Sequence, residues 1–219
     1  MSSLFKENRT TLKLALPIMA GQVSQMLIGL VDTLMIGRLT TTDLATAAFV
    51  NTLFNFPFVL GIGLFVAVSV QVSHEHGSEQ DHSAAESLRN GLWLAIFLGG
   101  ILATALVCLI PWLSVFRQPE AVTAKAPVYL TWLALSLIPV IPAMTIKSFA
   151  EAKNHPWAVL WIMLGGVGLN VLLNYLLIFG NWGFPALGLS GAGIATLLAR
   201  IVTLWVLWEY LRHSRSMRK

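Results

Sequence analysis

Long apolar stretches dominate this sequence. The first covers Leu12–Ile36, a length typical of a helix that crosses a membrane. Five more follow, at roughly 44–72, 91–116, 122–146, 157–179 and 191–211. The bilayer core offers no partners to unpaired backbone groups, so each stretch is expected to be helical. The sequence therefore predicts an all-α transmembrane protein built as a six-helix bundle.

The composition supports this class and disfavours others. Hydrophobic residues make up 56% of the chain and charged residues 11%, whereas soluble domains carry about 25% charged residues. The net charge of +4 does not indicate nucleic-acid binding, because the basic residues lie near the ends of the apolar stretches. No soluble catalytic domain fits between six spans, and no metalloprotease or Ser–His motif is present. We therefore do not expect an enzyme.

The basic residues predict the orientation. If the N-terminus is cytosolic, the outer loops hold only Arg38, Arg117 and Lys125. The inner segments then hold the larger set, which is Lys6, Arg9, Lys13, Arg89, Lys147, Lys153, Arg212, Arg215, Arg218 and Lys219. This bias follows the positive-inside rule and puts both termini in the cytosol. We expect a cytosolic N-terminus at 1–11, a six-helix lobe at 12–211 and a basic cytosolic tail at 212–219.

Asp32 is the most informative polar residue, because it lies within the first apolar stretch. A carboxylate in hydrocarbon costs at least ~2.5 kcal/mol, so it usually has a function there. Counting ~1.5 Å per residue places Asp32, Asn170 and Thr196 in the outer half of the membrane. Asn174 shares a helix face with Asn170, four residues away. These four side chains are predicted to form one polar pocket that holds a proton or a sodium ion.

Two structural alternatives remain open for these residues. The amides and the hydroxyl can simply hydrogen-bond neighbouring helices. Asp32 can also be neutralised by Arg200, the one basic residue deep within an apolar stretch. Gln25, Asn51 and Arg200 are further intramembrane polar residues and candidates for a substrate cleft or a gate. No metal site is expected, because the histidines of the segment 74–87 match no ligand motif and fit a solvated turn.

Prolines predict bends in three of the spans. Pro17 lies early in the first stretch and is either a fixed bend or a hinge. Pro57, with Gly61 and Gly63, is expected to break the second. A proline pair, Pro139 and Pro142, lies near the end of the fourth.

Several motifs, taken in order, resemble the multidrug and toxic compound extrusion (MATE) transporters. They are LALPIMAGQVSQMLIGLVDTLMIGRL (14–39), LGIGLFVAVSVQVSHEHG (60–77), AEAKNHPW (150–157), GLNVLLNYLLIFG (168–180) and GLSGAGIATLLAR (188–200). The resemblance implies a secondary antiporter of the cytoplasmic (inner) membrane. Such a protein exports organic, often cationic drugs or metabolites in exchange for Na⁺ or H⁺, with no other cofactor.

By motif position, Asp32 matches the first-helix cation-binding acid of the family. Asn170 and Asn174 match paired polar positions of the fifth helix, Thr196 a position of the sixth, and Pro17 a first-helix kink. Some proton-coupled members have Asp at the second of the paired positions, where this chain has Asn174. That leans toward the NorM-type pattern and leaves the coupling ion open.

The chain departs from the family in length. MATE transporters have twelve helices in two lobes, and this sequence resembles the N-terminal lobe alone. Its expected partners are membrane lipids, a small organic substrate and a second six-helix lobe, from a missing C-terminal half or a second copy. The rival functions are a lipid-linked sugar flippase and a non-transporting membrane assembly subunit.

Overall fold

The structure is a computed structural model that describes the backbone of residues 2–77 and 81–214, and the side chains of 15–72, 74 and 85–214. Within these ranges it is all helical. Its elements are α1 (Ser2–Ile36), α2 (Thr41–Gly77), α3 (Asp81–Cys108), a 3-10 helix (Ile110–Phe116), α4 (Glu120–Leu135), α5 (Leu137–Ala152), α6 (Pro156–Phe179), a short 3-10 turn (Asn181–Gly183) and α7 (Leu189–His213). The helices α4 and α5 together form one span, so the described chain has six candidate membrane spans. The predicted six-helix class is confirmed.

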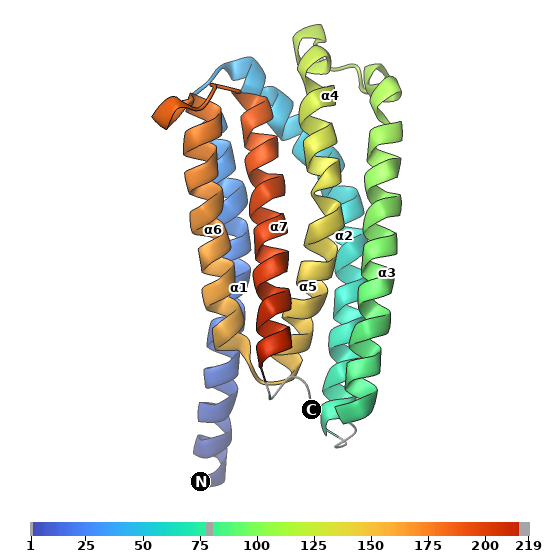
Figure 1. Ribbon diagram of the computed structural model, residues 1–219, viewed down its shortest axis with the longest axis vertical. Coiled ribbons are helices and arrows are strands. Elements are labelled where there is room, and N and C mark those ends of the chain that lie inside the picture. Colours follow the sequence, from blue (N-terminus) through green and yellow to red (C-terminus); the bar gives the residue numbers. More distant parts are fainter. Residues whose placement is uncertain (1, 78–80, 215–219) are drawn as a thin grey trace.

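The bundle has two sides that share a central span. On one side α1, α6 and α7 pack together, and on the other α2 and α3 pack against α4 and α5 (Figure 1). Every residue of 139–150 is buried, so α5 lies in the core. By contrast, α1 touches α2 little, and both expose large apolar side chains such as Met26, Leu30, Phe56 and Val70.

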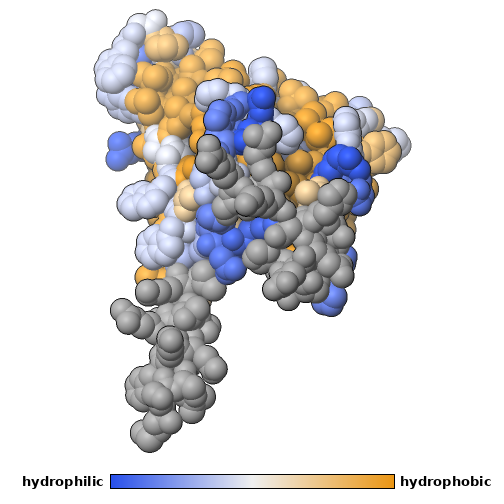
Figure 2. Space-filling view, turned by 60° about the horizontal axis from the view of Figure 1, so that its bottom comes forward, coloured by the Kyte–Doolittle hydropathy of each residue, from blue (hydrophilic) through white to orange (hydrophobic). Residues whose placement is uncertain are grey.

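The chain is a multi-pass membrane protein by its spans. The start of α1 and the end of α7 lie at the same end of the bundle, as six crossings require (Figure 1). Figure 2 shows hydrophilic residues gathered at that end, with hydrophobic residues over the flank. Which side of the membrane this end faces stays a prediction from the basic residues.

Two details of the predicted spans are wrong. The helix α2 runs from Thr41 to Gly77 through Pro57 without a break, because a proline removes only one backbone hydrogen bond from a long helix. The third span ends earlier than expected, at Cys108. Pro111 lies in the first turn of the 3-10 helix that follows, where its missing N–H is tolerated.

Other segments are more helical than expected. The helix α1 extends to Ser2 and continues through Pro17, and helical backbone covers most of the turn expected at 74–87. Residues 78–80, the side chains of His76 and His82, and 215–219 of the basic tail lie outside the described residues.

A break does occur in the central span, at Ser136 between α4 and α5. Pro139 lacks the N–H that would donate to the carbonyl of Leu135, which leaves the ladder incomplete at this point. The Ser136 hydroxyl donates to the carbonyl oxygen of Leu133 at 2.6 Å. A polar side chain is thereby fixed in the middle of the bundle.

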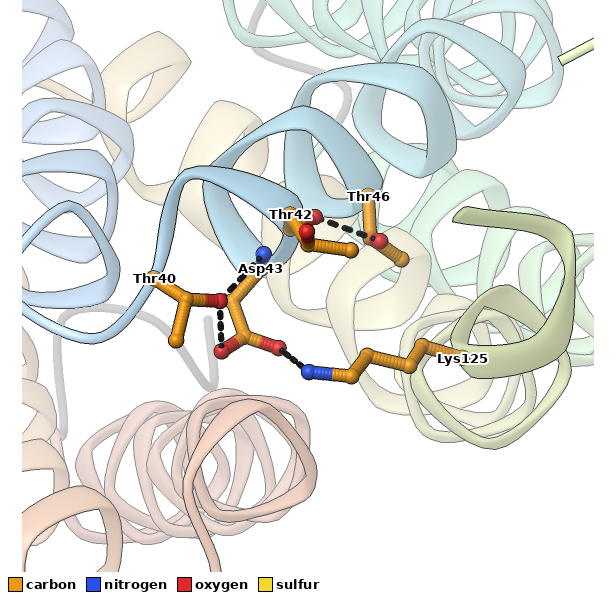
Figure 3. Close-up of polar contacts among 5 residues, drawn as sticks. All are labelled: Thr40, Thr42, Asp43, Thr46 and Lys125. Atoms are coloured by element: carbon orange, nitrogen blue, oxygen red, sulfur yellow. Dashed lines mark hydrogen bonds and ion pairs between the residues drawn. The ribbon is translucent and has the colours of Figure 1, made fainter. Parts of the chain in front are cut away.

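An ion pair ties α2 to α4 near the ends of these helices (Figure 3). Thr40 caps α2: its hydroxyl accepts from the Asp43 backbone N–H at 3.1 Å and donates to Asp43 Oδ2 at 2.6 Å. The other carboxylate oxygen of Asp43 pairs with Lys125 Nζ at 2.6 Å. The Asp43 side chain is only 10% exposed, so its charge depends on this partner.

Replacing Lys125 with Met is expected to lower stability by roughly 1 kcal/mol, because it leaves a largely buried carboxylate without its cation. The double variant D43N/K125M should recover part of the loss. Thermal unfolding of the purified chain in detergent measures both. The control is R89Q, which removes an exposed 4.0 Å ion pair with Glu86 and should change little. A K125M protein as stable as wild type would contradict this role.

Candidate functional site

A buried polar cluster joins α1, α6 and α7. Asn174 donates from Nδ2 to Asp32 Oδ1 at 2.5 Å and to Asn170 Oδ1 at 3.2 Å. Thr196 Oγ1 lies 3.3 Å from Asp32 Oδ2 and 3.0 Å from the carbonyl oxygen of Ala192. The four residues predicted to share a pocket therefore lie together, while their role in cation binding stays a prediction.

Close helix packing holds the cluster together. The helices α6 and α7 approach so tightly that a Cβ on Gly191 would lie 2.3 Å from the backbone oxygen of Leu177. A Cβ on Gly166 would lie 2.5 Å from Thr203 Oγ1. Glycines at these two places let the backbones meet, and Asn174 and Thr196 can then reach the same carboxylate.

The chemistry of the cluster suits a small hard cation or a proton. Asp32 is 8% exposed, and Asn170, Asn174 and Thr196 are 2% exposed or less. The cluster offers carboxylate, amide and hydroxyl oxygens, the ligands that hard cations prefer. Two buried amide atoms, Asn174 Oδ1 and Asn170 Nδ2, have no hydrogen-bond partner. Buried polar atoms are usually paired, so these two leave hydrogen-bonding capacity unused within the cluster.

Arg200 lies near the cluster and does not pair with Asp32. Its guanidinium donates to the Ser136 hydroxyl and lies over the Phe54 ring, 5.0 Å from the centroid. Among the described residues no ion pair joins it to Asp32, although the two charges are close enough to interact electrostatically. The alternative in which the two form a direct structural ion pair is therefore wrong.

The remaining candidates fall in different places. Gln25 lines a cavity of about 30 Å³ beside the cluster, together with Asn170, Thr196 and Arg200. Asn51 lies on α2, near the buried hydroxyl of Tyr129. Pro17 is buried on α1, about 22 Å along the helix from Asp32, and is not part of the cluster.

The sequence matches the MatE family model over residues 17–176, which is most of the chain. The chain belongs to the MATE family. A probable multidrug resistance protein NorM of Mesorhizobium japonicum is 33% identical over 201 residues, covering 89% of this chain and 42% of that protein. A second NorM, of Synechococcus, is 34% identical over 199 residues, covering 90% of this chain and 42% of its own length. The chain spans about half the length of the curated relatives it matches.

Solved MATE structures share the fold. A eukaryotic MATE transporter superposes with a TM-score of 0.90 at 20% identity, covering 97% of this chain and 47% of that one. An outward-facing multidrug resistance MATE transporter superposes with a TM-score of 0.84 at 24% identity, covering 93% of this chain and 45% of that one. At these identities the likeness establishes the fold, and it supports a six-helix lobe as the unit described here.

Sequence reasoning missed two residues of this MATE lobe. Tyr129 is 1% exposed and close enough to Asp32 and Arg200 to interact electrostatically with both. Ser136 holds Arg200 at the break of the central span. The available signal was that both are polar residues within an apolar stretch, and that Ser136 lies three residues before a proline.

Gly191→Ala is expected to lower the stability of the lobe by about 1–3 kcal/mol, because the new Cβ collides with the backbone of α6. Gly168→Ala is the matched control on α6, since a Cβ there has nothing within 4 Å. That variant should be neutral or slightly stabilising, because Ala favours a helix over Gly by up to ~1 kcal/mol. Thermal unfolding of both variants measures the difference, and equal stability would contradict the close approach.

Proposed function

We propose that this chain is the cation-binding lobe of a secondary antiporter, which exports organic, often cationic, drugs or metabolites in exchange for Na⁺ or H⁺. The observation that carries the proposal is the buried Asp32 cluster in a chain of the MATE family. Relatives named as probable multidrug resistance proteins support the substrate class.

In this proposal Asp32 supplies the charge and its neighbours supply the selectivity. The carboxylate accepts a proton, or coordinates a sodium ion through an oxygen. The oxygens of Asn170, Asn174 and Thr196 then complete the ligands of the ion. The apolar helices around the cluster exclude bulk water, which strengthens these interactions. Binding the cation drives export only if the lobe holds the ion more tightly in one conformation than in the other.

The substrate is proposed to sit outside the cluster, between this lobe and a second six-helix lobe. Curated relatives about twice as long as this chain support the second lobe. The exposed apolar faces of α1 and α2 are available to line such a cleft. Asn51 on α2, Gln25 on α1 and Arg200 on α7 are the polar candidates for contact or gating, and Pro17 is the candidate bend of α1.

The protein is proposed to lie in the cytoplasmic membrane with both termini in the cytosol. The excess of Lys and Arg in the predicted inner segments supports this orientation. The common end of α1 and α7 fits it, because both chain ends then face one compartment (Figure 1). The lipid bilayer covers the outer apolar surface.

Asp32→Asn is expected to abolish cation binding by the purified chain while leaving expression and folding intact, because the amide keeps the shape and loses the charge. Binding of ²²Na⁺ at high pH, and protonation followed by the infrared carboxyl band, measure the two possible ions. Asp43→Asn is the matched control, since it removes a carboxylate that is paired with Lys125 outside the cluster. Binding that survives in D32N would favour the assembly-subunit alternative.

Reconstitution in liposomes tests transport itself. A dimer of the chain, in which a second copy supplies the second lobe, is expected to move an organic cation such as ethidium only under the gradient of its coupling ion, and the monomer is expected to be inactive. Molecular mass and export are measured together, with imposed Na⁺ or H⁺ gradients. Export by a dimer would identify a half-size antiporter and its ion. Export that proceeds equally with neither gradient would contradict antiport.

A further inference from the structure

Arg200 brings a permanent positive charge next to the proposed cation site. It lies on α7 one helical turn beyond Thr196, whose hydroxyl contacts Asp32. Arg200, Thr196 and Asn170 also line one small cavity. A guanidinium is never deprotonated in a protein, so this charge persists whatever ion is bound.

The guanidinium is held close to Asp32 without touching it. It donates to Ser136 at the break between α4 and α5, and the Phe54 ring of α2 lies beneath it. The oxygens of Asp32 are instead contacted by Asn174 and Thr196. Among the described residues no cation is paired with this carboxylate, although it interacts with the charge of Arg200.

We propose that Arg200 is a built-in counter-cation that weakens the binding of the coupling ion at Asp32, so that the ion can leave the lobe. This inference rests on the proposed function of the Asp32 cluster. Ser136 is its positioning residue, because it keeps the guanidinium from closing a direct ion pair.

The charge balance explains the effect. Without the coupling ion, Asp32 and Arg200 offset each other, so the buried carboxylate is tolerated in the membrane. With the ion bound, the pair carries a net positive charge, and the two cations repel each other. For two unit charges about 8–10 Å apart in an effective dielectric of about 20, such a repulsion corresponds to a roughly 15- to 35-fold loss of affinity. Transport requires binding that is weak enough to reverse.

The test compares the affinity of the purified full chain for ²²Na⁺ and for protons in a set of variants. R200Q removes the charge and should raise the affinity for the bound ion by about tenfold or more. R200K keeps the charge and should stay close to wild type. S136A frees the guanidinium to pair directly with Asp32 and should lower the affinity below wild type. A structural defect would weaken binding in R200Q, so a gain of affinity is specific to the electrostatic role.

Arg212→Gln is the matched control. It removes the same charge from α7 at an exposed position paired with Glu209, and should leave the affinity unchanged. Unchanged or weaker binding in R200Q overturns the inference. If D32N loses cation binding while R200Q behaves like wild type, the Arg200 role fails and the proposed function stands. Binding that survives in D32N overturns both.

Discussion

A carboxylate buried between apolar helices needs polar partners, and the arrangement of polar groups in this lobe follows from that need. Asp32 receives hydrogen bonds from side chains of α6 and α7, so three helices must meet at one point. Their meeting depends on glycines that let α6 and α7 approach closely, above all Gly191. Beyond the side chains that contact Asp32 lie two more groups, Tyr129 and Arg200, which interact with the carboxylate electrostatically and without direct contact. The site is thus a product of helix packing, since each helix alone contributes one or two polar side chains.

The central span links this site to the other side of the bundle. Its break at Ser136 follows from Pro139, and the hydroxyl at the break receives the guanidinium of α7. Phe54 brings α2 into the same contact. Elements from both sides of the bundle therefore meet at one half-buried cation, Arg200, although α1 and α2 themselves hardly touch. The ion pair of Asp43 and Lys125 separately joins α2 to α4.

The sequence predicted the spans and the cluster because both depend on position along a helix axis. Apolar length sets the number of spans, and the rise per residue sets the depths of Asp32, Asn170 and Thr196. The partner of Arg200 could not be predicted, since it depends on how α7 is rotated and on how far a long side chain reaches. The bend of the fourth span was foreseen from its prolines, whereas the break expected at Pro57 is absent because α2 continues as a helix past the one hydrogen bond that Pro57 cannot make.

The position of the Asp32 cluster determines whether the coupling ion and the exported substrate would compete for one site in the proposed antiporter. The cluster is enclosed by helices of a single lobe and is nearly sealed from the surface. An ion held there and a bulky compound lodged between two lobes would not compete for the same atoms. Exchange in the proposed antiporter would then be indirect. Binding of the ion would affect binding of the substrate only through the conformation of the helices, and both sites would be able to be occupied at the same time.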